Sequence, residues 1–335
     1  MKKPDFAEHL ASYLSKHLPL QQGASINTIK SYRDSFTIFL RYCRDVLNIK
    51  PEKLTMRTLN RRLIEDYLIW LENERNCGIS TRNHRLTTLH AFLRYVAVEN
   101  PEYMDICNEL LSIELKHAPK KSIEYLPVDE LKLIFSQPDT RSSNGKRDFA
   151  ILTLLYDSAA RVQELIDLRL KDIRHINPAT VKLTGKGNKG RIVPLMPDSA
   201  RIISDYIASL SHSDPEQYLF LNKKREKLTR SGIEFIISKY VVMANNGDNR
   251  LSCAKITPHI FRHSKAMHLI QAGVNIVYIR DLLGHVSVQT TEVYARADSD
   301  AKRKALENAS KNIIPETKFP QAKKEELLDW LKNLV

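Results

Sequence analysis

The sequence predicts a mainly α-helical protein with one small β-sheet, built as a helical N-terminal domain followed by a mixed α+β domain. Apolar side chains recur with the 3.6-residue period of a helix through most of the chain, most clearly over 26–47 and 80–96. The pattern changes to that of strands only around a glycine-rich turn within 181–195. A segment rich in proline and lysine at 116–122 separates the two halves. With 335 residues, 42% of them hydrophobic, each half can bury a core of its own.

The composition favours a polyanionic partner. The chain has 52 Lys and Arg against 39 Asp and Glu, a net charge of +13, so nucleic acid is the first candidate, with ribosomal and membrane-surface roles as alternatives. No stretch approaches the roughly 18 to 20 apolar residues of a membrane span, and the first residues lack a signal-peptide pattern. We therefore expect a cytoplasmic, nucleoid-associated protein without membrane contact. The four scattered cysteines predict reduced thiols and no structural zinc.

Residues 1–113 are predicted to be helical throughout. In 26–47 the apolar side chains fall on one arc, and in 80–96 Leu86, Leu89 and Leu93 are expected to point inward. Basic residues occupy neighbouring arcs of both helices. A solvated helix face explains any single one equally well, but their repetition in a basic chain favours a DNA-facing surface. The candidate DNA contacts are Lys30, Arg33, Arg41, Arg44, Arg82 and Arg85.

The second domain is predicted to start near Leu126 and Pro127, with Asp129 as the cap of its first helix. Another helix is expected over 147–156. Further along, 181–184 and 191–195 are predicted strands on either side of the turn Gly-Lys-Gly-Asn-Lys-Gly. From about residue 200 onward helices dominate again.

Five residues in this domain form a set suited to attack on a phosphodiester. Two arginines can hold phosphate oxygens in forked hydrogen bonds, histidines can move protons, and a tyrosine can form a covalent link. The spacing also gives local context. Pro258 at a helix start puts the histidine and arginine that follow it on one face, and Gly284 is expected to end the helix before the second histidine. The set is Arg161, His259, Arg262, His285 and Tyr294.

Two of these residues have an ordinary structural interpretation as well. Arg161, with Ser158 as a candidate cap before it, could form an ion pair with Glu164 or Asp167. The tyrosine could belong to the core. His263 suits a packed position behind the site, because a zinc protease motif would need a glutamate where Ile260 stands.

The order and spacing of these motifs resemble the tyrosine recombinase (phage integrase) family over almost the whole chain, in its mobile-element or Xer-like branches. The resemblance implies a helical DNA core-binding domain at 1–113, a linker at 114–125, a catalytic recombinase domain at 126–310 and a tail helix at 311–335. This tail helix docks either on its own chain or, as the resemblance favours, on a neighbouring protomer. The chain departs from the family at Ala159, where a glycine usually precedes the arginine.

The resemblance also implies a role for each residue. The tyrosine, whose phenol is about one part in a thousand ionised at pH 7, attacks the phosphate and forms a 3′-phosphotyrosyl link. Both arginines and His285 bind the phosphate, His259 accepts the phenolic proton, and Lys186 protonates the leaving 5′-oxygen, with Lys182 and Lys189 as rivals. No cofactor, ATP or metal is required.

The implied partners are double-stranded DNA with specific recombination sites, three further copies of the chain in a homotetramer on two sites, and an accessory recombinase or directionality factor. Integration and excision of a mobile element is the preferred role, and Xer-like dimer resolution of replicons is the alternative. A type IB topoisomerase, a catalytically silent DNA-binding protein and a metal nuclease are more distant rivals.

Overall fold

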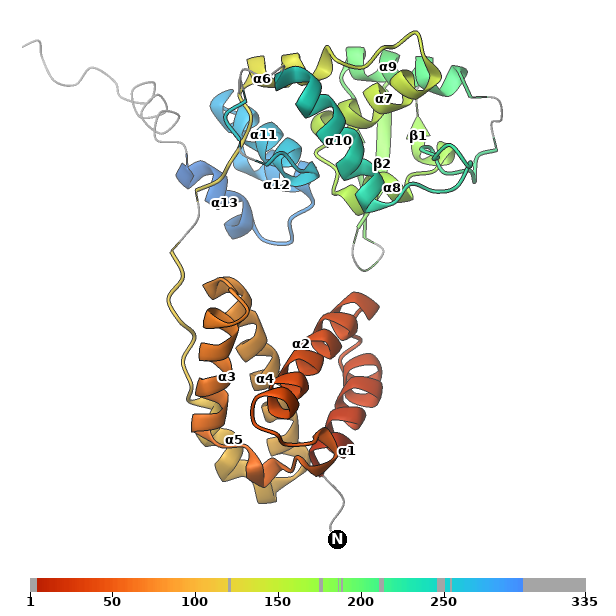
Figure 1. The fold of residues 1–335 in the computed structure, drawn as a ribbon. Helices are drawn as coiled ribbons and strands as arrows, with labels where there is room; N and C mark the ends of the chain where they lie inside the picture. Colours follow the sequence, from red (N-terminus) through yellow and green to blue (C-terminus); the bar gives the residue numbers. More distant parts are fainter. Residues whose placement is uncertain are drawn as a thin grey trace, which may run out of the picture. The chain divides into compact units, whose positions relative to one another are not determined.

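The computed structural model describes residues 5–119, 122–174, 177–185, 187, 189–210, 214–245, 251–253 and 255–297. The chain divides into two compact units, 1–121 and 122–335, each drawn in Figure 1. Lys186 and the predicted tail helix at 311–335 lie outside the described residues. No helix in the described ranges is long and apolar enough to cross a membrane.

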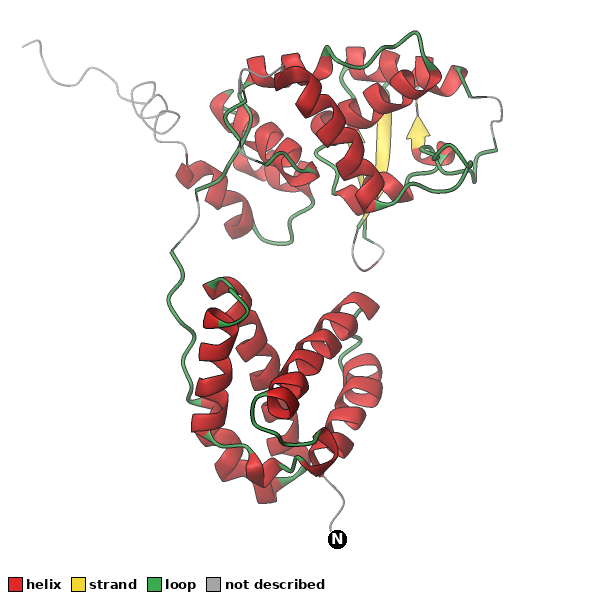
Figure 2. Cartoon of the chain, viewed as in Figure 1, coloured by secondary structure: helices red, strands yellow, loops and turns green. Residues whose placement is uncertain are grey.

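The first unit is helical, as predicted (Figure 2). Side chains cap two of its helices, Ser25 by accepting from the Thr28 amide and Asn60 by accepting from the Leu63 amide. Its elements are α1 (Asp5–Ser12), which continues as a π-helix (Tyr13–Gln21), α2 (Ile26–Asp45), α3 (Arg61–Asn73), α4 (Ile79–Glu99) and α5 (Met104–Leu111), with short 3-10 turns at Pro51–Lys53, Met56–Thr58 and Pro101–Tyr103.

Aromatic rings fill the core of this unit. Phe36 and Phe39 of α2 are buried, and Phe36 meets Phe92 of α4 edge to face with ring centroids 5.3 Å apart. The predicted inward positions Leu86, Leu89 and Leu93 are buried as well. The apolar periodicity of both segments is therefore confirmed.

The second unit surrounds one small sheet with helices (Figures 1 and 2). The strands are antiparallel in the order β1-β2-β3, and the predicted hairpin is confirmed, with Thr180 opposite Pro194. Strand β1 was not predicted, because two residues show no period. The elements are α6 (Val128–Phe135), α7 (Ser143–Asp157), α8 (Val162–Asp167), a 3-10 turn (Leu170–Asp172), β1 (Ile173–Arg174), β2 (Thr180–Thr184), β3 (Gly190–Pro194), α9 (Pro197–Ala208), α10 (Arg230–Asn245), α11 (Pro258–Gln271), α12 (Ile276–Leu283) and α13 (Val288–Ala297).

Two predicted caps are wrong. Pro127 occupies the cap position of α6, and Asp129 lies inside the first turn, where its carboxylate pairs with Lys132. Ser158 ends α7 instead of starting the next helix, because its hydroxyl donates to the Leu154 carbonyl.

Two apolar clusters hold the helices of this unit in place. The larger one is centred on α7, where the side chains Ile151, Leu152, Leu154 and Leu155 are inaccessible to solvent. The smaller one joins α11, α12 and α13 through Met267, Ile279, Leu283 and Tyr294. Because Tyr294 belongs to this second cluster, the packing of three helices fixes its position.

Candidate active site

The turn between α7 and α8 sets the position of the first arginine. Ala159 is buried and has a φ of +48°, a left-handed conformation that costs about 1 to 2 kcal/mol for a residue with a Cβ atom. Arg262 Nη1 donates to the Ala159 carbonyl at 2.7 Å, which stabilises the turn. The conformation explains why glycine suits this position, and the alanine of this chain adopts it nevertheless.

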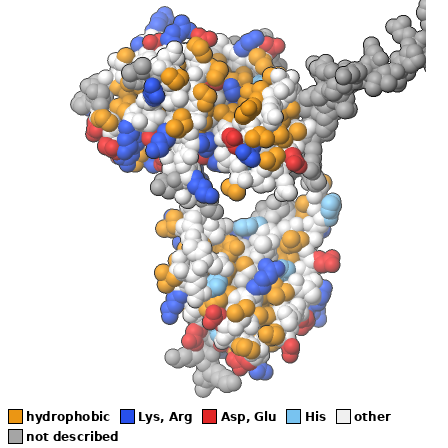
Figure 3. Space-filling model, turned by 180° about the vertical axis from the view of Figure 1, so that it is seen from behind, with side chains coloured by type: hydrophobic (Ala, Val, Ile, Leu, Met, Phe, Trp, Pro, Cys, Tyr) orange, Lys and Arg blue, Asp and Glu red, His pale blue; other side chains and the backbone are white. Residues whose placement is uncertain are grey.

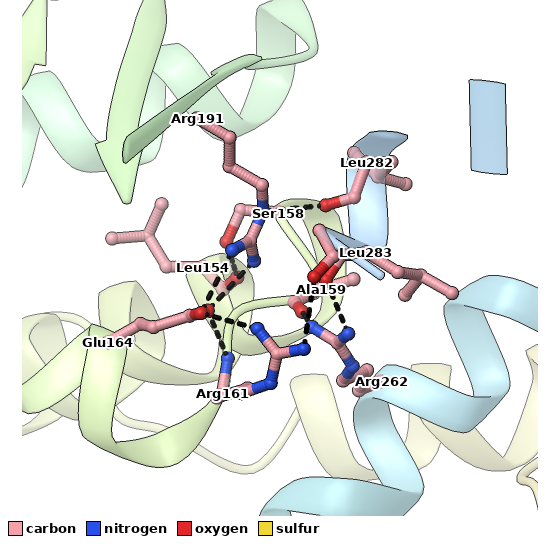
Figure 4. Close-up of polar contacts among 10 residues, drawn as sticks. Leu154, Ser158, Ala159, Arg161, Glu164, Arg191, Arg262, Leu282 and Leu283 are labelled. Carbon is pink, nitrogen blue, oxygen red and sulfur yellow. Dashed lines mark hydrogen bonds and ion pairs between the residues drawn. The ribbon is translucent and has the colours of Figure 1, made fainter. Parts of the chain in front are cut away.

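A buried carboxylate binds two arginines next to this turn (Figure 4). Glu164 is 3% exposed and accepts from the Arg161 amide at 2.8 Å and Arg161 Nη1 at 2.7 Å. It also accepts from Arg191 Nη1 and Nη2, at 2.9 and 2.8 Å. Burial raises the pKa of Glu164, but the hydrogen bonds from Arg191 and Arg161 outweigh burial and lower the pKa to about 2. The carboxylate is therefore ionised at neutral pH.

Arg161 fits both of its sequence-based interpretations, as a member of an ion pair and as a phosphate-binding residue. It forms the expected ion pair with Glu164, and its side chain remains 38% exposed. Its Nη2 atom donates to the Gly284 carbonyl at 3.3 Å, which brings it to the end of α12. An arginine held in this way is both oriented and reachable by a phosphate.

Arg262 connects the same two places from α11. Its guanidinium donates to the carbonyls of Ala159, at 2.7 Å, and Leu283, at 2.5 Å. Burial, followed by the charges of Arg161 and Arg191, lowers the pKa of Arg262 to about 10. The group still carries its positive charge at neutral pH.

Arg191 is a further member of the site that the sequence pattern does not reveal, since that pattern predicts only a strand at this position. Its Nε atom donates to the Leu282 carbonyl at 2.8 Å, in addition to its two bonds with Glu164. The sequence feature that could have identified Arg191 is its position directly after the glycine-rich turn, in a strand whose partner positions are apolar. Figure 4 shows Arg161, Arg191 and Arg262 converging between the α7–α8 turn and the end of α12.

Gly284 ends α12 in the left-handed conformation, with a φ of +61°, as the sequence predicted. A Cβ atom at this position would lie 2.9 Å from Arg191 Nη1. Glycine is therefore favoured both by the backbone conformation and by the close approach of this arginine.

His285 follows in the loop before α13. Its Nδ1 atom lies 3.0 Å from the buried Thr291 hydroxyl. Burial, followed by the charges of Arg262, Arg161 and Arg191, lowers the pKa of His285 to about 4. The imidazole is therefore neutral at pH 7, and if the threonine donates to Nδ1, the ring proton is on Nε2.

Tyr294 lies in α13 and is 4% exposed. The ring of His285 stacks beside it, with centroids 6.4 Å apart and planes at 8°. Burial raises the pKa of Tyr294, and the charges of Arg262 and Arg161 partly offset that effect. The phenol is protonated at neutral pH and needs a base before it can attack.

The hydrogen-bond partner of this phenol differs from the one expected. Tyr294 Oη lies 2.7 Å from Nδ1 of His263, for which the sequence predicts a packed position behind the site. Within the described residues, no hydrogen bond joins the phenol to His259, whose ring stacks on that of His263 at 6.4 Å. The signal for His263 was its position next to Arg262, one turn after His259.

Lys186 lies outside the described residues, but Gly185 before it belongs to this site. A Cβ atom on Gly185 would come within 3.1 Å of the Glu164 carboxylate. The β2–β3 turn therefore starts beside the arginines. The rival residues Lys182 and Lys189 are both exposed.

The predicted DNA contacts of the first unit divide into two groups. Lys30, Arg33, Arg41 and Arg44 are exposed on α2. On the face drawn in Figure 3, Lys and Arg side chains are interspersed with acidic and apolar ones and form no single continuous patch. The distribution of charge on this face therefore does not by itself locate a DNA-facing surface.

For Arg82 and Arg85 on α4, the structure shows side-chain contacts within the helical unit, and their role as DNA contacts stays a prediction. The Arg82 side chain is 14% exposed and donates to Asn83 and to the Glu114 carbonyl. Arg85 Nη1 donates to Ser35 of α2 at 2.5 Å. Both guanidiniums are engaged in contacts within the helical unit.

Comparison with known proteins identifies the class of protein that this fold and site define. Residues 124–300 match the phage integrase family, and residues 12–100 match the phage integrase N-terminal SAM-like domain. The chain belongs to this family of tyrosine recombinases, enzymes that cleave and rejoin DNA. The predicted family, fold class and enzyme class are thereby confirmed.

Individual relatives support this assignment. The chain is 31% identical to the putative integrase/recombinase y4rC of Sinorhizobium fredii, covering 92% of this chain and 93% of the relative. It is 30% identical to the tyrosine recombinase XerC of Pelotomaculum thermopropionicum, covering 88% and 95%.

Solved structures share the fold. The Tn1549 transposon integrase in complex with transposon right end DNA has a TM-score of 0.69 and 16% identity, covering 90% of this chain and 99% of that one. The XerH recombinase bound to a palindromic difH substrate has a TM-score of 0.65 and 20% identity, covering 90% and 84%.

Proposed function

We propose that this chain is a site-specific recombinase that cuts and rejoins double-stranded DNA through a 3′-phosphotyrosyl intermediate, with Tyr294 as the nucleophile, and that it integrates and excises a mobile element. One observation carries the proposal. Arg161, Arg262 and His285 gather around a buried, hydrogen-bonded Tyr294. Three groups that can bind a phosphate thus lie beside a group that can attack it.

In the proposed cleavage step, Tyr294 Oη forms a bond to phosphorus while the bond from phosphorus to the 5′-oxygen breaks. Negative charge grows on the non-bridging oxygens, and the two arginines stabilise it. Arg262 has five N–H donors, and only some of them are used by the carbonyls of Ala159 and Leu283. The others remain for a phosphate oxygen.

Two further groups complete the step. Neutral His285 donates a hydrogen bond from Nε2 to a non-bridging oxygen. Lys186, carried by the β2–β3 turn next to Gly185, gives a proton to the leaving 5′-oxygen, a contribution of about 10²- to 10⁴-fold in rate. The 5′-hydroxyl of a second strand reverses the step, so the energy of the phosphodiester bond is kept.

The DNA is held by both units in this proposal. Exposed residues of α2, namely Lys30, Arg33, Arg41 and Arg44, contact phosphates. Four copies on two recombination sites act in alternating pairs, with an accessory recombinase or directionality factor.

One observation favours the mobile-element role. A relative that covers 92% of the chain is a putative integrase/recombinase. Dimer resolution is the second candidate, because XerC of Pelotomaculum thermopropionicum is similar at 30% identity. Amplification across a circular junction of the DNA flanking the gene separates the two, since only excision produces such a circle.

The cleavage chemistry is tested by trapping the covalent link. Purified protein is mixed, in EDTA, with labelled nicked duplexes tiled across the DNA flanking its own gene, and adducts are resolved in SDS. We expect adducts with the wild type, none with Tyr294→Phe, and wild-type amounts with Tyr278→Phe, a control at a tyrosine that is 70% exposed. Adducts that survive Tyr294→Phe, or that require a divalent metal, would contradict the proposal.

A further inference from the structure

We infer that His263, rather than His259, accepts the phenolic proton of Tyr294 during strand cleavage. The inference rests on the proposed function and adds one catalytic residue to it. Nothing in the family resemblance assigns this position, and the sequence placed it behind the site.

The geometry already fits proton transfer. The distance of 2.7 Å between His263 Nδ1 and Tyr294 Oη is within the range expected for a base and the proton it removes. The two ring centroids are 5.5 Å apart, with planes at 51°. The ring of His259 stacks on the ring of His263, with the two centroids 6.4 Å apart. Direct transfer to His259 would therefore require the tyrosine to move first.

The protonation state agrees with this geometry. Burial, followed by the nearby His259 and Arg262, lowers the pKa of His263, so the ring is neutral at pH 7 and can take up a proton. The groups that face it are His259 and Arg262 from its own helix, Tyr294 from α13, and His285 from the loop before α13. None of them is a carboxylate that would hold the imidazole protonated in advance.

With His263 as the base, every proton and bond in the cleavage step is accounted for. With its own proton on Nε2, His263 accepts the phenolic proton at Nδ1 and becomes an imidazolium. The Tyr294 Oη to phosphorus bond forms, and the bond to the 5′-oxygen breaks, with a proton for that oxygen supplied by a separate acid. In the reverse step, Nδ1–H returns the proton to the phenolate as it leaves.

The test measures single-turnover adduct formation by the full chain on a nicked duplex that reacts with the wild type. His263→Asn keeps a side-chain amide near the position of Nδ1, so it preserves a hydrogen bond, but it cannot hold a proton. We expect cleavage to slow by about 10²- to 10⁴-fold. Replacing Tyr294 by a difluorotyrosine, whose phenol ionises at lower pH, should recover much of this loss, because a more acidic nucleophile needs less help from a base.

A matched control exists on the same helix. His268 also pairs through Nδ1 with a tyrosine hydroxyl, that of Tyr156, at 2.9 Å. His268→Asn removes a comparable histidine away from the phosphate site and should leave the cleavage rate within about threefold of the wild type. Melting temperature and DNA binding verify that each variant is folded, and His263→Gln replaces His263→Asn if the latter is not.

The outcomes separate this inference from the function on which it rests. If the wild type forms a Tyr294-dependent adduct and the folded His263 variant cleaves within about threefold of it, the inference is wrong and the proposed function stands. A slow variant that the fluorinated tyrosine does not rescue also overturns it, since the loss is then structural. If the wild type forms no adduct on any fragment, the proposed function fails, and the inference with it.

Discussion

Replacing Glu164 by glutamine removes the negative charge that binds two guanidiniums at the centre of the site. The carboxylate is 3% exposed and accepts hydrogen bonds from Arg161 and Arg191. Its pKa falls from 4.5 to about 2, and this difference corresponds to about 3 kcal/mol of stability at 1.36 kcal/mol per pH unit. Leaving a buried ion without its partner costs about the same amount, 3 to 5 kcal/mol.

The sign of the pH dependence follows from the direction of that pKa. Because the pKa in the folded state is lowered, Glu164 contributes its full stabilisation above the pKa of the unfolded chain, near 4.5. The contribution is lost as the pH falls toward 2, where the folded protein also binds a proton. The wild type should therefore exceed Glu164→Gln by about 3 kcal/mol at pH 7 and by progressively less below pH 4.5.

Differential scanning calorimetry of the full chain measures this effect, since the two units can unfold separately. We expect the transition of the second unit to fall by about 6 to 12 °C at pH 7. Glu216→Gln is the matched control, because Glu216 also binds two cations, Arg169 and Lys171, but is exposed. The control should melt as the wild type does. A Glu164 variant that melts like this control, or a difference that grows as the pH falls, would refute the reasoning.

Three other predictions follow from particular contacts. Gly284→Ala should destabilise the protein by more than Gly273→Ala. Both glycines have positive φ, which costs an alanine about 1 kcal/mol or more, but only at Gly284 would the added Cβ atom meet a neighbour. Chemical denaturation measures the unfolding free energy of both variants. Thr291→Val should slow cleavage and cost about 1 kcal/mol of unfolding free energy, because the buried hydroxyl holds the adjacent histidine. Lys30→Ala should reduce the salt dependence of DNA binding by about one counterion, whereas Arg85→Ala should lower the melting temperature, because that arginine bonds within the helical unit.

Each of these predictions has a clear contrary result. Equal losses for the two glycine variants would mean that the close approach to Arg191 has no energetic consequence. Wild-type cleavage by the Thr291 variant would mean that the threonine does not orient His285. An Arg85 variant that is as stable as the wild type but binds DNA more weakly and with less salt dependence would mean that Arg85 contacts DNA.

Much of the site could be predicted because its spacing is local. Pro258 starts α11 and Gly284 ends α12, and these signals lie within a few residues of the positions they control. These local signals predicted where His259, Arg262, His285 and Tyr294 lie relative to the ends of the helices. The Gly-rich turn likewise predicted the β2–β3 hairpin.

The remaining features depend on long-range packing. Arg191 bonds with Glu164 from 27 positions along the chain, and no local pattern identifies that partner. His259 and His263 lie one turn apart on α11, so the packing of α13 decides which of them reaches the phenol. A local period could not make that distinction.

The contacts of the α4 arginines within the helical unit were not predicted for a related reason. An amphipathic helix is expected to have one buried and one solvated face, but α4 packs against α2, α3 and α5. The arc that carries Arg85 therefore meets Ser35 of α2 instead of solvent.

The central claim is that the phenolic oxygen of Tyr294 forms the covalent bond to the 3′-phosphate of the DNA. Trypsin cleavage after Arg280 and Arg296 gives a peptide, 281–296, in which Tyr294 is the only tyrosine. Mass spectrometry of the trapped adduct, digested with nuclease and trypsin, should find this peptide carrying a 3′-linked nucleotide on its tyrosine. An unmodified 281–296 peptide together with a nucleotide on any other residue would contradict the account.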